Sequence, residues 1–140
     1  MRRDSRLIPL SREHHAPLRL GRRLIAGGAQ DELRAMLPAL QAHFAEEERT
    51  LLPRLRAGGE RALAQRLLDE HRALSALFAR ALQGECEAET GKALIDHVRF
   101  EERQVFERAQ AVLADGILED VHAARPKLDA ACTVRRNPED

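Results

Sequence analysis

Two histidine–glutamate pairs in this sequence have a spacing that suits metal binding. His43 is followed four positions later by Glu47, and His97 is followed four positions later by Glu101. Residues four apart on a helix project from the same face, one turn from each other. Each pair could therefore present an imidazole nitrogen and a carboxylate oxygen to the same ion. Burying a carboxylate is costly unless it is paired or bound to a metal, so the pairs indicate a metal centre if their helices face a core.

Two further histidines, His14 and His71, lie on apolar stripes at helical spacing. The stripe of His71 contains Leu67, Leu74 and Phe78. The stripe of His14 contains Leu10, Leu18, Gly21 and Ile25, whereas that of the adjacent His15 contains Ser11, Arg19 and Arg22. The pattern predicts that His14 faces the core. His15 stays open as the alternative ligand, because its spacing to Leu18 matches that of His71 to Leu74; otherwise it would line the mouth of the pocket.

The segments that carry these residues form an internal repeat. Glu-His at 13–14 precedes His-Phe-Ala-Glu-Glu-Glu at 43–48, and Glu-His at 70–71 precedes His-Val-Arg-Phe-Glu-Glu at 97–102. Two equivalent helical hairpins facing each other would assemble a nearly symmetric set of four imidazoles and two carboxylates. Six nitrogen and oxygen ligands are too many for one tetrahedral zinc ion, but they suit two ions that share the carboxylates. Imidazole with carboxylate favours iron, with manganese and zinc as substitutes.

Composition indicates which elements must position these residues. The chain has 140 residues, of which 44% are hydrophobic, 33% are charged and only 3% are aromatic. This length predicts one domain, and the abundance of Ala, Leu, Arg and Glu favours helix over strand. The formal net charge of zero argues against a nucleic-acid partner. We found no apolar run that could span a membrane, no signal peptide and no CxxC motif, and therefore expect a cytoplasmic protein with no membrane partner.

Glycines divide the sequence into four long stretches with helical periodicity. The expected helices cover residues 10–26, 31–56, 60–82 and 88–114, and a short fifth helix is expected at 117–124. Short connections favour an all-α, up-down-up-down antiparallel four-helix bundle. The expected organisation is an N-terminal arm at 1–9, the bundle at 10–124 and a C-terminal tail at 125–140. Pro17, Pro38 and Pro53 lie inside these stretches and are expected to kink or end a helix, although the apolar period continues beyond them.

The order of these residues resembles the hemerythrin-like HHE cation-binding domains over roughly residues 10–115. The resemblance implies a four-helix bundle around a di-iron centre. His14, His43, His71 and His97 would be terminal ligands, and Glu47 and Glu101 would be bridging carboxylates. The oxygen-carrying hemerythrins use a fifth histidine four positions after the one that His71 matches, where this chain has Ser75. The pattern is more similar to bacterial HHE proteins that are linked to sensing of oxygen, nitric oxide or iron and to stress repair.

Three functions stay open from the sequence. The first is a non-haem di-iron protein that binds or senses O2 or NO, or handles iron. The second is an enzyme on the same centre that reduces peroxide or nitric oxide, or oxidises Fe(II); His15, Glu46 and Glu48 are its nearest candidate acids. The third is a metal-free helical interaction module whose histidines belong to an ordinary core. Phe44, Phe78, Phe100 and Phe106 are expected to wall the centre, and the sequence leaves open whether the protein forms a homodimer.

Overall fold

Residues 13–112 are described by a computed structural model, and every structural statement below refers to them. Helix α2 spans His15–Ala26, α3 spans Gln30–Ala57, α4 spans Arg61–Ala81 and α5 spans Glu87–Phe100. A π-helical segment, η1 (Glu101–Val105), follows α5 directly and continues into α6 (Phe106–Val112). The predicted all-α fold is therefore confirmed.

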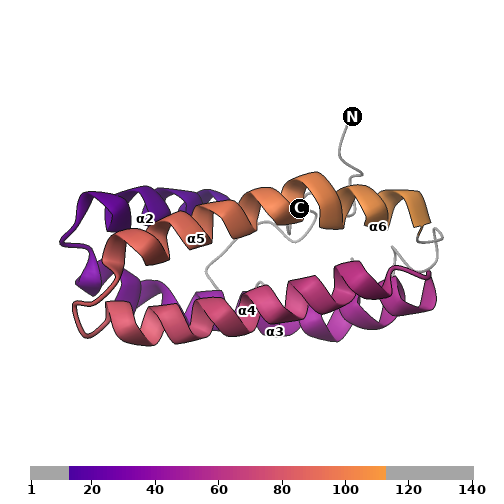
Figure 1. Ribbon diagram of the computed structural model, residues 1–140, viewed down its shortest axis with the longest axis horizontal. Coiled ribbons are helices and arrows are strands. Elements are labelled where there is room, and N and C mark those ends of the chain that lie inside the picture. The colour runs from indigo at the N-terminus through magenta and orange to yellow at the C-terminus, as the bar shows by residue number, and fades with distance from the viewer. Residues whose placement is uncertain (1–12, 113–140) are drawn as a thin grey trace.

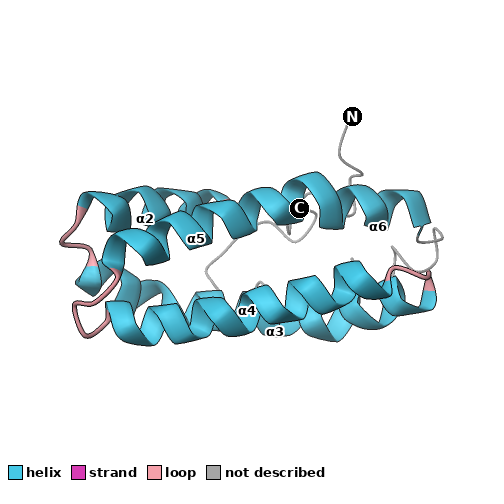
Figure 2. Cartoon of the chain, in the orientation of Figure 1, coloured by secondary structure: helices cyan, strands magenta, loops and turns pink. Residues whose placement is uncertain are grey.

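The helices form the predicted antiparallel four-helix bundle (Figures 1 and 2). Helix α2 contacts α5 and α3, and α4 contacts α3 and α5, so helices that follow one another in the chain are neighbours around the bundle. The turns between α2 and α3 and between α4 and α5 lie at one end, and the turn between α3 and α4 lies at the other (Figure 1). None of the helices within residues 13–112 has the length and apolar character needed to cross a bilayer.

The buried interior consists of two apolar clusters on either side of a polar layer. The cluster toward the α3–α4 turn includes Leu51, Leu55, Leu67, Val105 and Phe106. The cluster toward the other end includes Leu20, Leu24, Leu33, Leu74, Phe78 and Leu94. Between them lie the buried imidazoles and carboxylates of the candidate site. The apolar layers hold the helices together on both sides of the polar groups, so those groups lie in a closely packed, buried environment.

The prolines do not interrupt the helices as expected. Helix α3 continues through both Pro38 and Pro53 to Ala57, close to the expected end at residue 56, so neither proline ends it. Each proline removes only one backbone donor, and buried residues on both sides keep the helix in place. Pro17 lies in the first turn of α2, where a backbone N–H has no partner within the helix in any case.

Two details of the helix pattern also differ from expectation. The fourth helix is not regular, because the π-helical segment begins at Glu101. Ile25, expected on the buried stripe of the first helix, is 48% exposed, and Leu24 is buried in its place. Helix α2 begins at His15, with residues 13–14 in a turn, and residues 10–12 of the expected first helix lie outside the described residues. The expected arm at 1–9, the fifth helix at 117–124 and the tail at 125–140 lie outside the described residues.

Candidate metal centre

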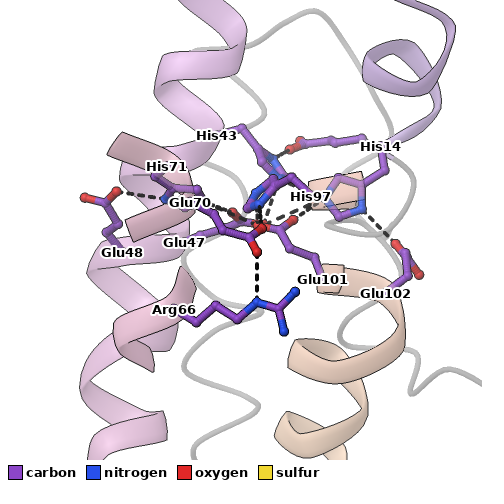
Figure 3. Close-up of polar contacts among 11 residues, drawn as sticks. His14, His43, Glu47, Glu48, Arg66, Glu70, His71, His97, Glu101 and Glu102 are labelled. Carbon is purple, nitrogen blue, oxygen red and sulfur yellow. Dashed lines mark hydrogen bonds and ion pairs between the residues drawn. The ribbon is translucent and has the colours of Figure 1, made fainter. Parts of the chain in front are cut away.

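The structure brings the six predicted side chains together in the middle of the bundle (Figure 3). Each is at most 5% exposed. They come from all four sides of the bundle: His14 immediately precedes α2, His43 and Glu47 lie on α3, His71 lies on α4, His97 lies on α5, and Glu101 begins the π-helical segment. His15, the alternative to His14, is exposed and belongs to neither group of potential ligands.

One half of the centre contains His14 and His43. The Nε2 atoms of these imidazoles are 3.3 Å apart. The Nε2 of His43 is 2.8 Å from Oε2 of Glu47, and the Nε2 of His14 is 2.6 Å from Oε1 of Glu101. One imidazole pair thus meets one oxygen from each carboxylate, and these four side chains form a group that could hold a metal ion.

The other half repeats this arrangement with His71 and His97. The Nε2 of His97 is 2.8 Å from Oε2 of Glu101, and the Nε2 of His71 is 3.1 Å from Oε1 of Glu47. Glu47 and Glu101 therefore belong to both groups, and each contributes a different oxygen to each half. This is the arrangement that two carboxylates bridging two cations require.

The donor atoms converge on shared positions rather than satisfying one another. Among the described residues, both carboxylate oxygens of Glu47, Oε1 of Glu101 and Nε2 of His97 are buried and lack a hydrogen-bond partner. Each is nevertheless within 2.6–3.1 Å of another member of the cluster. Ligands at right angles around one metal, each about 2.1 Å from it, are about 3 Å apart. The spacing and the unpaired atoms fit cations at these positions.

Four further carboxylates surround the centre, one for each imidazole, and three of them, Glu48, Glu70 and Glu102, are labelled in Figure 3. Nδ1 of His14 is 2.8 Å from Glu102, and Nδ1 of His71 is 2.8 Å from Glu48. Nδ1 of His43 is 2.6 Å from Glu13, and Nδ1 of His97 is 2.7 Å from Glu70. A carboxylate on Nδ1 fixes the imidazole with that nitrogen protonated and its Nε2 free to bind a metal. We call Glu13, Glu48, Glu70 and Glu102 the outer carboxylates.

Sequence reasoning did not assign this role to the outer carboxylates. The repeat contained the signal, because Glu13 and Glu70 directly precede His14 and His71, while Glu48 and Glu102 directly follow the two central glutamates. Each outer carboxylate contacts a histidine from a different helical segment. That pairing depends on helix rotation, which spacing along one helix does not specify.

The central groups stabilise each other's charges. Burial lowers the pKa of His43, but the negative charge of Glu47 and the hydrogen bond to Glu13 outweigh this effect and raise the pKa to about 9. Burial also lowers the pKa of His71, but the hydrogen bond to Glu101 and the charges of Glu47 and Glu101 outweigh this effect and raise the pKa to about 10. Burial and the charge of Glu101 raise the pKa of Glu47, yet the neighbouring imidazoles of His43 and His14 lower it to about 2 overall. A bound cation would take the place of the protons on Nε2.

Of the four phenylalanines predicted to wall the centre, three have a ring against an imidazole. Phe44 stacks on His71 with centroids 4.1 Å apart, and Phe106 stacks on His14 at 5.6 Å. Phe100 lies 6.2 Å from His97. The ring of Phe78 lies 6.4 Å from that of Phe44, so it supports the wall from behind. These rings place apolar surface around the buried imidazoles.

The residues considered as acids for an enzyme differ in their positions. Glu48 hydrogen-bonds His71 and is partly exposed. Glu46 is buried but pairs with Arg49 rather than with the cluster. His15 is exposed. Only Glu48 of the three therefore touches the centre.

The fold and the centre together define a helical-bundle domain built to bind cations. A family model described as the hemerythrin HHE cation-binding domain matches residues 6–109. The chain belongs to the hemerythrin HHE cation-binding domain family. Neither curated proteins nor solved structures gave a match to it. The family resemblance inferred from the sequence is confirmed, and with it a domain type that binds metal cations.

Proposed function

We propose that the chain is a non-haem di-iron protein whose ligands are His14, His43, Glu47, His71, His97 and Glu101. The observation that carries the proposal is the placement of Glu47 and Glu101 between two imidazole pairs, with one oxygen of each carboxylate toward each pair. A single ion could not use all of these donors, because the two groups share only the carboxylates. Two bridged ions use every one.

The donor set supports iron over other metals. Each ion would have two imidazole nitrogens and two carboxylate oxygens, a mixture that suits iron and is accepted by manganese and zinc. Four protein donors leave about two positions open on a six-coordinate ion. Those positions make a small ligand such as O2, NO or peroxide the natural partner of the centre.

The protein would orient and shield the ions. The outer carboxylates hold the imidazoles by Nδ1, and the phenylalanine rings keep water from the central layer. A reduced pair of iron ions would supply one electron each to a bound small molecule. The buried setting leaves little room for a large organic substrate at the centre.

Metal analysis of protein prepared under iron-replete, reducing conditions tests this proposal. We expect close to two iron ions per chain, and loss of most of the iron in Glu101→Ala and His97→Ala. His14→Ala and His15→Ala form a matched pair, because the two histidines are adjacent but only His14 belongs to the cluster. His14→Ala should lose metal and His15→Ala should keep it. Absence of metal from the unmodified protein would contradict the proposal and favour a metal-free helical module.

A further inference from the structure

A hollow of about 330 Å³ opens between α3 and α4 beside one half of the centre. Its wall includes Ala45 and Glu48 from α3 and Arg72 and Ser75 from α4, and it reaches the rings of Phe44 and His71. A water molecule occupies about 30 Å³ in the liquid, so the hollow is wide enough for small molecules. It meets the centre at His71, which belongs to the half that contains His97.

The opposite face of the bundle is packed differently, although the repeat makes it equivalent. By the spacing from His14 and His97, Ser75 corresponds to Leu18 and Ala45 corresponds to Arg99. On this face α2 and α5 meet at Gly21 and Gly91. A Cβ added to Gly21 would lie 2.6 Å from Cγ1 of Ile95 and 3.0 Å from the carbonyl oxygen of Gly91, so the two backbones already touch.

The α3–α4 face has small side chains at the positions where the α2–α5 face has larger ones, and this leaves the α3–α4 face open. Ala45 and Ser75 are exposed, and neither fills the space above Phe44. The serine leaves that side of His71 without a further imidazole. The six ligands are therefore arranged nearly symmetrically, but the side chains around them differ between the α3–α4 face and the α2–α5 face.

We infer that the hollow between α3 and α4 is the route by which an uncharged diatomic molecule reaches the His71–His97 half of the centre. This inference rests on the proposed di-iron function. It makes the two halves unequal, because the ligand arrives first at the ion that His71 and His97 would hold. Phe44 lies at the inner end of the route, stacked on the imidazole of His71.

Filling the hollow tests the inference, with nitric oxide as the probe. The variant Ala45→Phe/Ser75→Phe places two rings at exposed positions of the wall, where they need not disturb the core. Leu18→Phe is the matched control, because it enlarges the equivalent position on the α2–α5 face. Iron content and thermal unfolding are measured first for each protein, and stopped-flow absorption then gives the rate of nitric oxide binding to the reduced protein.

We expect all three proteins to hold equal iron. We expect the double variant to bind nitric oxide at least about tenfold more slowly, equivalent to about 1.4 kcal/mol of added barrier. Leu18→Phe should bind at the unmodified rate. Equal rates in all three proteins, or slowing in Leu18→Phe instead, would overturn the access route while leaving the di-iron function intact. A lack of iron in the unmodified protein would overturn the proposed function and the route with it.

Discussion

Glu70 offers a direct measure of how much an outer carboxylate contributes to metal binding. Its carboxylate accepts hydrogen bonds from Nδ1 of His97 at 2.7 Å and from Nε of Arg66 at 2.8 Å (Figure 3). Burial raises the pKa of Glu70, but the hydrogen bonds from His97 and Arg66 outweigh it and lower the pKa below its ordinary value. The group is thus a charged acceptor that orients His97 toward the centre.

Removing this acceptor in Glu70→Ala frees the imidazole of His97 to rotate and weakens it as a donor. Loss of such a partner typically lowers metal affinity by about 10- to 100-fold, which equals about 1.4–2.7 kcal/mol. Glu70→Gln keeps an oxygen acceptor without the charge, so its loss should be smaller than that of the alanine variant. Metal affinity should therefore decrease from the unmodified protein to Glu70→Gln and decrease further in Glu70→Ala.

Competition between the protein and a chelator for Co²⁺ measures this order without any catalytic assay. Glu32→Ala is the control, because it removes the same charge from an exposed ion pair with Arg23. Nitrogen chemical shifts of His97 would report whether its Nδ1 remains protonated. An unchanged affinity in Glu70→Ala, or an equal loss in Glu32→Ala, would refute the role of the outer carboxylate.

Three further predictions concern the packing, the turns and the reaction with oxygen. Gly91→Ala should destabilise the metal-free protein by up to about 2 kcal/mol, because its Cβ would meet the carbonyl oxygen of Gly21; overpacking costs about 1–3 kcal/mol, and the gain in helix propensity offsets about 1 kcal/mol of it. Urea unfolding that shows equal or higher stability would contradict this. Glu87 accepts hydrogen bonds from the Gln30 side chain and the Gly28 backbone, and these lower its pKa below 4.5. The stability that these hydrogen bonds add should therefore be present above pH 4.5 and should be lost as the pH falls through the lowered pKa. The difference in unfolding free energy between the unmodified protein and Glu87→Gln should become smaller as the pH falls. A difference that grows in acid would contradict the lowered pKa of Glu87. The reduced di-iron protein should oxidise in air without a stable oxygenated form, because Ser75 leaves one ligand fewer than in an oxygen carrier. An absorption band of an oxygenated form that disappears on deoxygenation over repeated cycles would instead indicate an oxygen carrier.

The sequence predicted those parts of the site that depend on one helix at a time. The spacing of His43 with Glu47 and of His97 with Glu101 specifies a shared face, and the structure places all four side chains in one cluster. The choice of His14 over His15 rested on an apolar stripe, and His14 is buried although Ile25 of that stripe is exposed. Several residues define the buried face of a helix, so the wrong assignment of Ile25 did not change which face was predicted to be buried.

The parts that depend on how helices approach each other could not be predicted. The π-helical segment that begins at Glu101 adds a turn whose stability comes from the surrounding contacts, and no residue type marks it. The pairing of Glu13 with His43 joins residues 30 positions apart and requires the rotation of both segments. The hollow beside Ser75 likewise arises from the spacing between α3 and α4, whereas the sequence shows only that the side chain there is small.

The central claim is that two bridged iron ions occupy one chain, and Mössbauer spectroscopy of isotope-enriched protein tests it most directly. The shared carboxylates of Glu47 and Glu101 would couple the two ions magnetically. We predict two iron ions per chain in similar nitrogen and oxygen environments, with no magnetic splitting at low temperature in the oxidised state because the spins cancel. A magnetically split spectrum from a single isolated ferric ion, at one iron per chain, would contradict the account.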